Sequence, residues 1–173
     1  MLRKGLVIAA LFGALCVLPN VAHAQVSRGQ WELTLGGAAN NGPNFNGFSA
    51  AVNGSLGYFV TDALEFSVRQ SVAYSDLGGS GWDGSTRLAL DYHVPVTDAL
   101  LPYVGANLGY VYGPNVRDTF EAAPEAGVKY FVNPSTFIYV SVEYQFFFNQ
   151  NTSSGAAFKN GQFIYGLGIG FRF

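Results

Sequence analysis

The chain is short of charge and nearly free of cysteine. Charged residues make up 12% of its 173 residues, about half of the ~25% share in an average soluble domain. Much of the surface is therefore expected to lie away from water. The single cysteine is Cys16, near the N-terminus. The rest of the chain has no thiol for a disulfide or a metal, and the sequence points to no cofactor.

A second absence is an apolar run long enough for a membrane-spanning helix. Beyond residue 24 no stretch approaches the ~20 apolar residues that such a helix needs. The composition is nevertheless apolar, with 49% hydrophobic and 16% aromatic residues. Because lipid satisfies no open backbone groups, a membrane protein without spanning helices has one alternative, a closed β-barrel.

The first 24 residues have the character of a secretory signal peptide. Arg3 and Lys4 precede an apolar run, which ends before an Ala-His-Ala sequence at 22–24. This pattern predicts cleavage between Ala24 and Gln25, so that 1–24 is a signal peptide and 25–173 is one domain. Acidic residues outnumber basic ones in the whole chain, 11 to 9. A basic face for nucleic acid is therefore excluded.

From residue 30 onward, apolar residues recur at every second position, which is the period of a β-strand. One face of each segment is apolar, and the other is polar or rich in glycine. This is the pattern of strands with lipid on one side and a barrel lumen on the other. The expected strands lie near 29–40, 47–59, 64–75, 84–94, 102–112, 121–132, 137–148 and 161–173.

The connections between these segments alternate in kind. Those near 60–63, 95–101 and 133–136 carry Asp, Asn and Pro in turn roles. The others, near 41–46, 76–83, 113–120 and 149–160, are mostly longer and rich in Gly, Asn and Ser. Short periplasmic turns and longer external loops are typical of outer-membrane barrels.

The sequence thus predicts an all-β fold, an eight-stranded antiparallel up-and-down transmembrane β-barrel. A soluble β-sandwich also has alternating strands. Its outer face would be solvated and rich in charge, whereas the polar face here is poor in charge.

The final strand carries a family resemblance. Its sequence, Gly-Gln-Phe-Ile-Tyr-Gly-Leu-Gly-Ile-Gly-Phe-Arg-Phe, resembles the closing strand of small bacterial outer-membrane β-barrel proteins, those similar to OmpX and to the OmpA membrane domain. The resemblance implies that the barrel assembly machinery reads Tyr165, Phe171 and Phe173. It also implies a monomer among the lipids and lipopolysaccharide of a Gram-negative outer membrane. It implies no particular activity, because one fold serves many functions.

Charged side chains are expected to gather in the lumen. The interior of an eight-stranded barrel is just wide enough for side chains to fill it. Folding the third and fourth segments about Ser80 places Arg69 opposite Asp91. Folding the sixth and seventh about 133–134 places Glu125 opposite Glu143. Buried charges persist only when paired. We therefore expect a lumen charge network of Glu32, Arg69, Arg87, Asp91, Glu125, Lys129 and Glu143.

Two functions fit such a network. In the first, the ion pairs plug the lumen, and the protein has a structural or surface-interaction role in the cell envelope. In the second, the pairs exchange partners and gate a narrow pore for ions or small solutes.

An outer-leaflet lipid-modifying enzyme is a third interpretation. It requires a Ser/His/acid group at the external rim, where the histidine activates the nucleophile. The one histidine beyond residue 24 is His93, which lies two residues before Pro95 at a predicted periplasmic turn. We therefore expect a structural role for His93, no metal site and no enzymatic activity.

Aromatic residues are also expected in the external loops. They would anchor the barrel at the membrane interface or contact an external partner. These residues are Phe45, Trp82, Phe120 and Phe158.

Overall fold

Eight β-strands follow one another along the chain. The computed structural model describes residues 26–41, 47–76, 81–114, 116, 118–148 and 161–173, and in this part no helix is long and apolar enough to cross a membrane. The strand number is as predicted. The strands are β1 (Trp31–Asn41), β2 (Phe48–Phe59), β3 (Leu64–Ser75), β4 (Gly81–His93), β5 (Leu100–Tyr112), β6 (Thr119–Phe131), β7 (Thr136–Phe148) and β8 (Gln162–Arg172).

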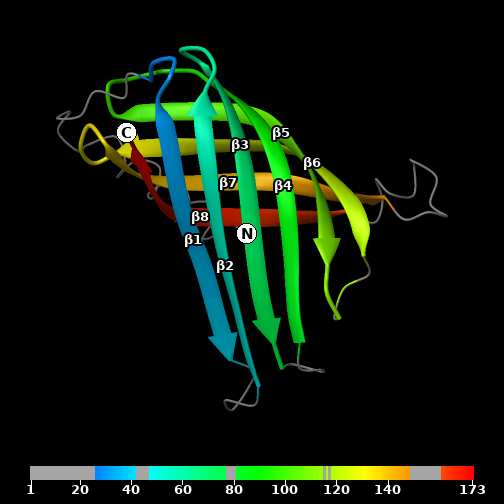
Figure 1. Cartoon of the computed structure of the whole chain (residues 1–173). Helices are drawn as coiled ribbons and strands as arrows, with labels where there is room; N and C mark the ends of the chain where they lie inside the picture. The colour runs from blue at the N-terminus through cyan, green and yellow to red at the C-terminus, as the bar shows by residue number, and fades with distance from the viewer. Residues whose placement is uncertain (1–25, 42–46, 77–80, 115, 117, 149–160) are drawn as a thin grey trace, which may run out of the picture.

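The strands form a closed antiparallel barrel. Each strand pairs with the next, and β1 pairs with β8 to close the ring. The strands at the front of Figure 1 cross those at the back at a wide angle, as strands tilted around a barrel do. The predicted fold class is confirmed. We call the end with the β2–β3, β4–β5 and β6–β7 connections the turn end, and the opposite end the loop end.

Side-chain oxygens stabilise each connection at the turn end. The backbone N–H of Leu64 donates to Thr61 Oγ1 at 2.9 Å, and that of Leu100 donates to Thr97 Oγ1 at 3.0 Å. The N–H of Thr136 likewise donates to Asn133 Oδ1 at 2.8 Å. The repeated spacing of three residues explains why Thr and Asn begin these turns.

A turn defined in this way also fixes the register of its hairpin. Glu125 lies opposite Glu143 across β6 and β7, as predicted from the turn at Asn133. The prediction for β3 and β4 was wrong, because Arg69 faces Arg87 and Asp91 faces Glu65. The last pair of that hairpin is Ser75–Gly81. The connection is therefore centred before Ser80, about which the predicted register was folded. The glycine- and serine-rich segment has no residue that dictates a turn type, so alternation alone misplaced its centre.

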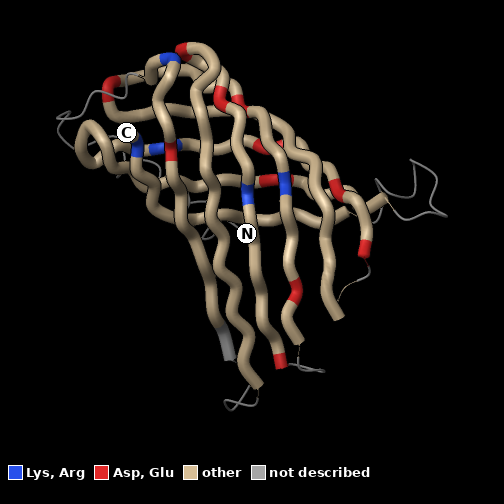
Figure 2. Tube along the Cα trace, in the orientation of Figure 1, with Lys and Arg blue, Asp and Glu red and all other residues tan. Residues whose placement is uncertain are grey.

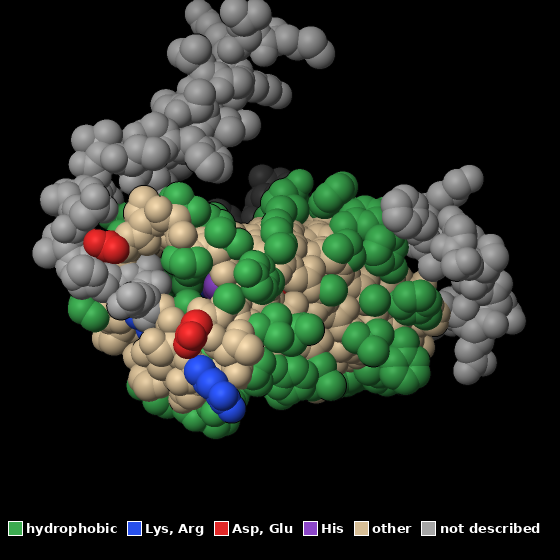
Figure 3. Space-filling model, turned by 90° about the horizontal axis from the view of Figure 1, so that it is seen from above, with side chains coloured by type: hydrophobic (Ala, Val, Ile, Leu, Met, Phe, Trp, Pro, Cys, Tyr) green, Lys and Arg blue, Asp and Glu red, His purple; other side chains and the backbone are tan. Residues whose placement is uncertain are grey.

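The outer wall of the barrel is apolar. Hydrophobic side chains cover it, whereas the charged side chains visible in Figure 3 gather at the turn end. Aromatic pairs join neighbouring strands near their ends, with ring centroids 5.0 Å apart for Tyr74 and Trp82 and 5.1 Å for Tyr110 and Phe120. Such rings suit the membrane interface.

The loop positions predicted for Trp82 and Phe120 were therefore wrong. Trp82 belongs to β4 and Phe120 to β6, with exposed fractions of 65% and 60%. The strands continue further than the loop composition indicated, because outward-facing aromatic residues extend the pairing. Phe45 and Phe158 lie outside the described residues, as do Ala24 and Gln25 of the predicted cleavage site.

An apolar cluster fills the lumen at the turn end. Its members are buried and come from five separate elements, the segment before β1 and strands β2, β5, β6 and β7, so they pack across the interior rather than along one strand. The cluster consists of Val26, Phe59, Leu101, Phe131 and Phe137.

Candidate functional site: the lumen charge network

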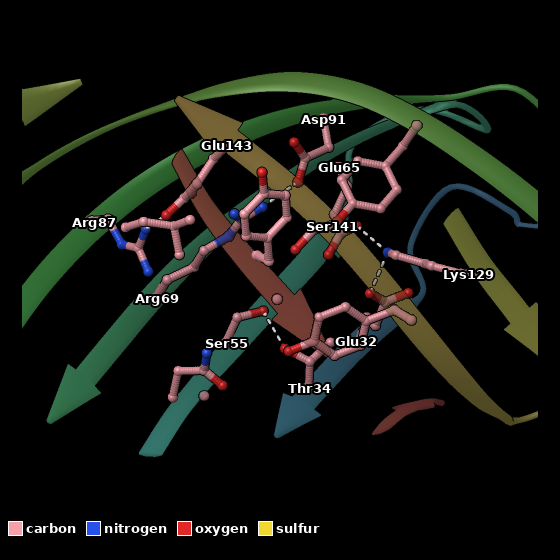
Figure 4. A pocket seen from close by; sticks show the side chains of 17 residues that line it. Glu32, Thr34, Ser55, Glu65, Arg69, Arg87, Asp91, Lys129, Ser141 and Glu143 are labelled. Atoms are coloured by element: carbon pink, nitrogen blue, oxygen red, sulfur yellow. Dashed lines mark hydrogen bonds and ion pairs between the residues drawn. The ribbon is translucent and has the colours of Figure 1, made fainter. Parts of the chain in front are cut away.

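The middle of the lumen holds charged side chains from several strands. Basic and acidic residues lie across the central part of the barrel in Figure 2, and their side chains point inward around a cavity of about 100 Å³ in Figure 4. They project inward because each occupies the inward parity of its strand. Three basic residues, Arg69, Arg87 and Lys129, organise the site.

Arg69 on β3 binds two carboxylates. Its Nη1 and Nη2 donate to the two oxygens of Glu125, each at 2.7 Å, and Nη2 also donates to Asp91 Oδ2 at 2.5 Å. The fork geometry of a guanidinium suits this bidentate contact. Asn107 Nδ2 then links Glu125 to Glu143, at 2.7 and 3.0 Å.

Arg87 on β4 holds the loop-end side of the network. Its Nη1 donates to Glu143 Oε1 at 2.6 Å, and its Nη2 donates to Ser71 Oγ at 3.2 Å. Arg87 Nε lies 3.8 Å from Glu121 Oε1. Glu121 is fully buried, so this ion pair lies away from solvent.

Lys129 on β6 holds the turn-end side. Its Nζ donates to Glu32 and, at 2.9 Å, to Glu65. The same ammonium lies between 5.3 and 5.8 Å from the ring centroids of Phe137, Tyr103 and Phe59. The aromatic faces stabilise a cation that has lost its water.

His93 lies next to this group. Its Nε2 is 3.4 Å from Glu65 Oε2, and its ring lies against those of Phe59 and Tyr103. His93 is buried. The imidazole is thus enclosed by aromatic rings at the turn end.

The seven residues predicted for the network come together in this lumen. Glu32, Glu65, Asp91, Glu121, Glu125 and Glu143 supply carboxylates to Arg69, Arg87 and Lys129. Sequence reasoning left Glu65 and Glu121 out of the network, although both have the inward parity of their strands. It also overlooked the inward parity of Phe59, Phe131 and Phe137, which is the signal that could have revealed the apolar cluster.

Acidic groups outnumber basic groups in the described network. A carboxylate excess raises the question of a bound metal ion. Among the described residues, no group of three or more His, Cys, Asp or Glu side chains is arranged to hold one. The described side chains form crossed ion pairs between separate strands of the barrel.

A vestibule lies above the network at the loop end. Its volume is about 420 Å³, and both polar and apolar side chains line it. Residues from β3 to β8 line it, among them Ser71, Ala73, Ser85, Val111, Gln145 and Phe147.

The residues of the predicted assembly signal lie on β8 and directly after it. Phe173 exchanges backbone hydrogen bonds with Trp31, at 2.8 and 2.9 Å. Tyr165 and Phe171 are exposed on the outer wall. The C-terminal residues thus close the barrel against β1.

The closed barrel with an outward apolar wall defines an integral outer-membrane β-barrel protein. The family model for the outer membrane protein beta-barrel domain matches residues 7–173, and the chain belongs to this family. Outer membrane porin F of Pseudomonas aeruginosa is 27% identical, over 69% of this chain and 37% of its own length. The chain therefore spans well under half of that relative.

Solved structures show the same fold. The N-terminal β-barrel domain of Pseudomonas aeruginosa OprF has a TM-score of 0.64 and 23% identity, covering 86% of this chain and 100% of that one. OprG of the same organism has a TM-score of 0.59 and 13% identity, covering 88% and 99%. Neisserial surface protein A has a TM-score of 0.53 and 18% identity, covering 83% and 94%.

Proposed function

We propose that this protein is a structural or surface-interacting barrel of the Gram-negative cell envelope whose lumen does not conduct. The observation that carries this proposal is the succession of two barriers along the lumen. The apolar cluster closes the turn end, and the crossed ion pairs of Arg69, Arg87 and Lys129 fill the middle.

Each barrier opposes an ion for a different reason. An ion that enters the apolar cluster would lose its water without gaining a polar partner, which is costly. An ion that enters the charge network would have to displace a buried salt bridge, and the stranded partner would then be uncompensated.

A narrow pore is the second candidate function. The cavity of about 100 Å³ beside the ion pairs and the vestibule of about 420 Å³ above them support it. In this version the buried carboxylates exchange cationic partners and open a path for cations. The apolar cluster at the turn end counts against it.

Single-channel recording in planar bilayers tests the two functions against each other. We expect no stable current steps from the wild-type protein. If the apolar cluster is the deciding barrier, Phe137→Ala, which removes one of its buried rings, should introduce current steps. If the ion pairs suffice on their own, this variant should stay silent as well. Phe148→Ala, on the exposed face of β7, serves as the control and should remain silent. Stable steps from the wild type would overturn the structural role in favour of the pore.

The protein's passage to the membrane is also part of the proposal. Removal of the signal peptide between Ala24 and Gln25 would release the barrel domain. Recognition of Tyr165, Phe171 and Phe173 by the barrel assembly machinery would then insert it as a monomer. The apolar wall and its aromatic pairs suit contact with membrane lipids and lipopolysaccharide, and the loop end suits contact with an external partner.

Enzymatic activity is not part of this proposal. The buried His93 lies against aromatic rings at the turn end, where an outer-leaflet lipid would not reach it.

A further inference from the structure

The seam between β1 and β8 is paired along only part of its length. The pairs run from Glu32–Arg172 to Gly36–Gly168, with Trp31 and Phe173 adding backbone hydrogen bonds at the turn end. The other strand pairs of the barrel are aligned over most of their lengths, as from Trp31–Tyr58 to Asn41–Phe48 between β1 and β2.

Toward the loop end the two strands separate. In Figure 1, β1 runs downward to its arrowhead while β8 crosses toward the right, so their loop-end portions lie well apart. Among the residues that the structure describes, this part of β1 pairs only with β2, and this part of β8 pairs only with β7. Ala38 is exposed although it has inward parity, and Tyr165 has an exposed fraction of 78%.

The side chains change character at the same point. In the paired part of β1, the outward residues are Trp31, Leu33 and Leu35, whereas Gly37 and Ala39 follow. On β8 the outward-facing residues beyond the paired part are Phe163, Tyr165 and Leu167, and all three are highly exposed. The split is therefore bordered by small residues on β1 and by large apolar side chains on β8.

The lumen cavity extends to this split. The same cavity of about 100 Å³ that touches the ion pairs is also lined by Ile164, Tyr165 and Gly166 of β8. Uncharged polar side chains also line this cavity, among them Thr34, Asn53, Ser55 and Ser141. Asn53 Oδ1 is buried without a hydrogen-bond partner in the described structure.

Backbone groups along the two separated edges need a polar partner, because hydrocarbon offers none. The three cations of the network are already bonded, and its carboxylates are in excess. An anionic group would be repelled there. An uncharged group with hydroxyls or amides would satisfy the edges and the lining of the cavity.

We propose that the split between β1 and β8 is a lateral binding site for a single-chain amphipath with an uncharged, hydrogen-bonding head. The head occupies the cavity beside Asn53. The apolar chain of the amphipath leaves through the barrel wall over Gly37 and Ala39. It then lies against Tyr165 and Leu167 in the membrane. This site is in the barrel wall, so it does not depend on whether the lumen conducts.

A pair of cysteine cross-links tests the split itself, in a Cys16→Ser background and in phospholipid vesicles. Leu33→Cys/Phe171→Cys replaces a paired, outward-facing position and should form a disulfide readily. Ala39→Cys/Tyr165→Cys continues the same alignment across the split and should form little disulfide. Equal cross-linking of the two pairs would show that the seam closes in the membrane, and it would overturn the proposal.

Fluorescence quenching tests the ligand class. A bimane label on Ala38→Cys reports on the split, and one on Leu33→Cys reports on ordinary lipid contact. The probes are 11-bromoundecanol and 11-bromoundecanoate, the latter kept ionised. After normalisation to the Leu33 label, the alcohol should quench the Ala38 label about fivefold more than the carboxylate. Equal enhancement by both probes would overturn the uncharged-head assignment, and enhancement by neither would overturn the site.

Discussion

Arg69 illustrates how one residue can hold opposite walls of the barrel together. Its guanidinium on β3 binds Glu125 on β6 and Asp91 on β4, and both carboxylates are buried. A buried ion pair adds little net stability compared with a well-packed apolar pair. Replacing only one partner of the pair is costly, because the charge that remains has no partner.

The first prediction follows from this asymmetry. Arg69→Met strands two carboxylates and should destabilise the barrel by about 3–5 kcal/mol. Asp91→Asn leaves Arg69 bound to Glu125 and should be milder. Urea-induced unfolding in detergent micelles measures both, and a double-mutant cycle should give a coupling above ~0.5 kcal/mol. Small, additive effects would indicate a wet lumen in which solvent screens both charges.

The sequence predicted membership of this network better than its contacts. Inward parity identified Arg69, Asp91 and Glu125. The sequence also predicted that Arg69 would face Asp91. The two side chains do bind each other, but through a different register, in which Arg69 reaches past its cross-strand neighbour Arg87 on β4. Alternation specifies a face, whereas a contact depends on rotamers and on the positions of all neighbouring side chains.

At the scale of single strands, glycine on β8 allows close packing inside the lumen. A Cβ on Gly170 would lie 2.0 Å from a carbon of the Phe137 ring. That ring belongs to the apolar cluster and is fully buried, so it has little room to move. The narrow lumen thus depends on a residue without a side chain at this point.

We therefore predict that Gly170→Ala overpacks the turn end and costs about 1–3 kcal/mol. Gly54→Ala is the matched control, because its Cβ would meet Leu35 at an ordinary 3.4 Å. The same urea titration compares the two variants. A loss of stability at Gly54 as large as that at Gly170 would contradict the role assigned to the Phe137 contact.

The outward face of a strand should respond to charge according to its depth in the membrane. Leu88 lies outward in the middle of β4 with an exposed fraction of 50%, and Val96 is 61% exposed in the adjoining turn. Leu88→Arg should cost about 2–4 kcal/mol and Val96→Arg about 0–1 kcal/mol in lipid vesicles. Equal costs at the two positions would mean that the lipid-facing band is misplaced.

Hairpin registers show where strand-level prediction succeeds and fails. The β6–β7 register followed from the turn at Asn133, whose side chain accepts backbone hydrogen bonds. The β3–β4 register did not follow, because the sequence of its connecting segment offers no Thr or Asn at the spacing seen in the other turns, and alternation alone does not fix a register. Sequence periodicity determines faces, and only specific turn chemistry determines register.

At the scale of the whole molecule, strand count and closure were predictable, since eight amphipathic strands in lipid have to form a ring. The split between β1 and β8 was not predictable. The alternation of β8 continues through the split, and the small residues Gly37 and Ala39 indicate weak packing without showing where pairing ends. The seam pairs β1 with β8, which lie far apart in the sequence. No hairpin turn connects them, so no local sequence signal fixes where their pairing ends.

The orientation of the barrel is the last prediction, and it concerns the molecule as a whole. Short connections at the turn end indicate that this end faces the periplasm. Ser135 is exposed in one of these turns, whereas Ser80 and Ser154 lie in predicted external loops outside the described residues. In a Cys16→Ser background, Ser80→Cys and Ser154→Cys should react with a membrane-impermeant maleimide on intact cells. Ser135→Cys should react only after the outer membrane is permeabilised, which also controls for its reactivity. Labelling of Ser135→Cys alone on intact cells would reverse the orientation and place the vestibule on the periplasmic side, where no external ligand or partner could reach it directly.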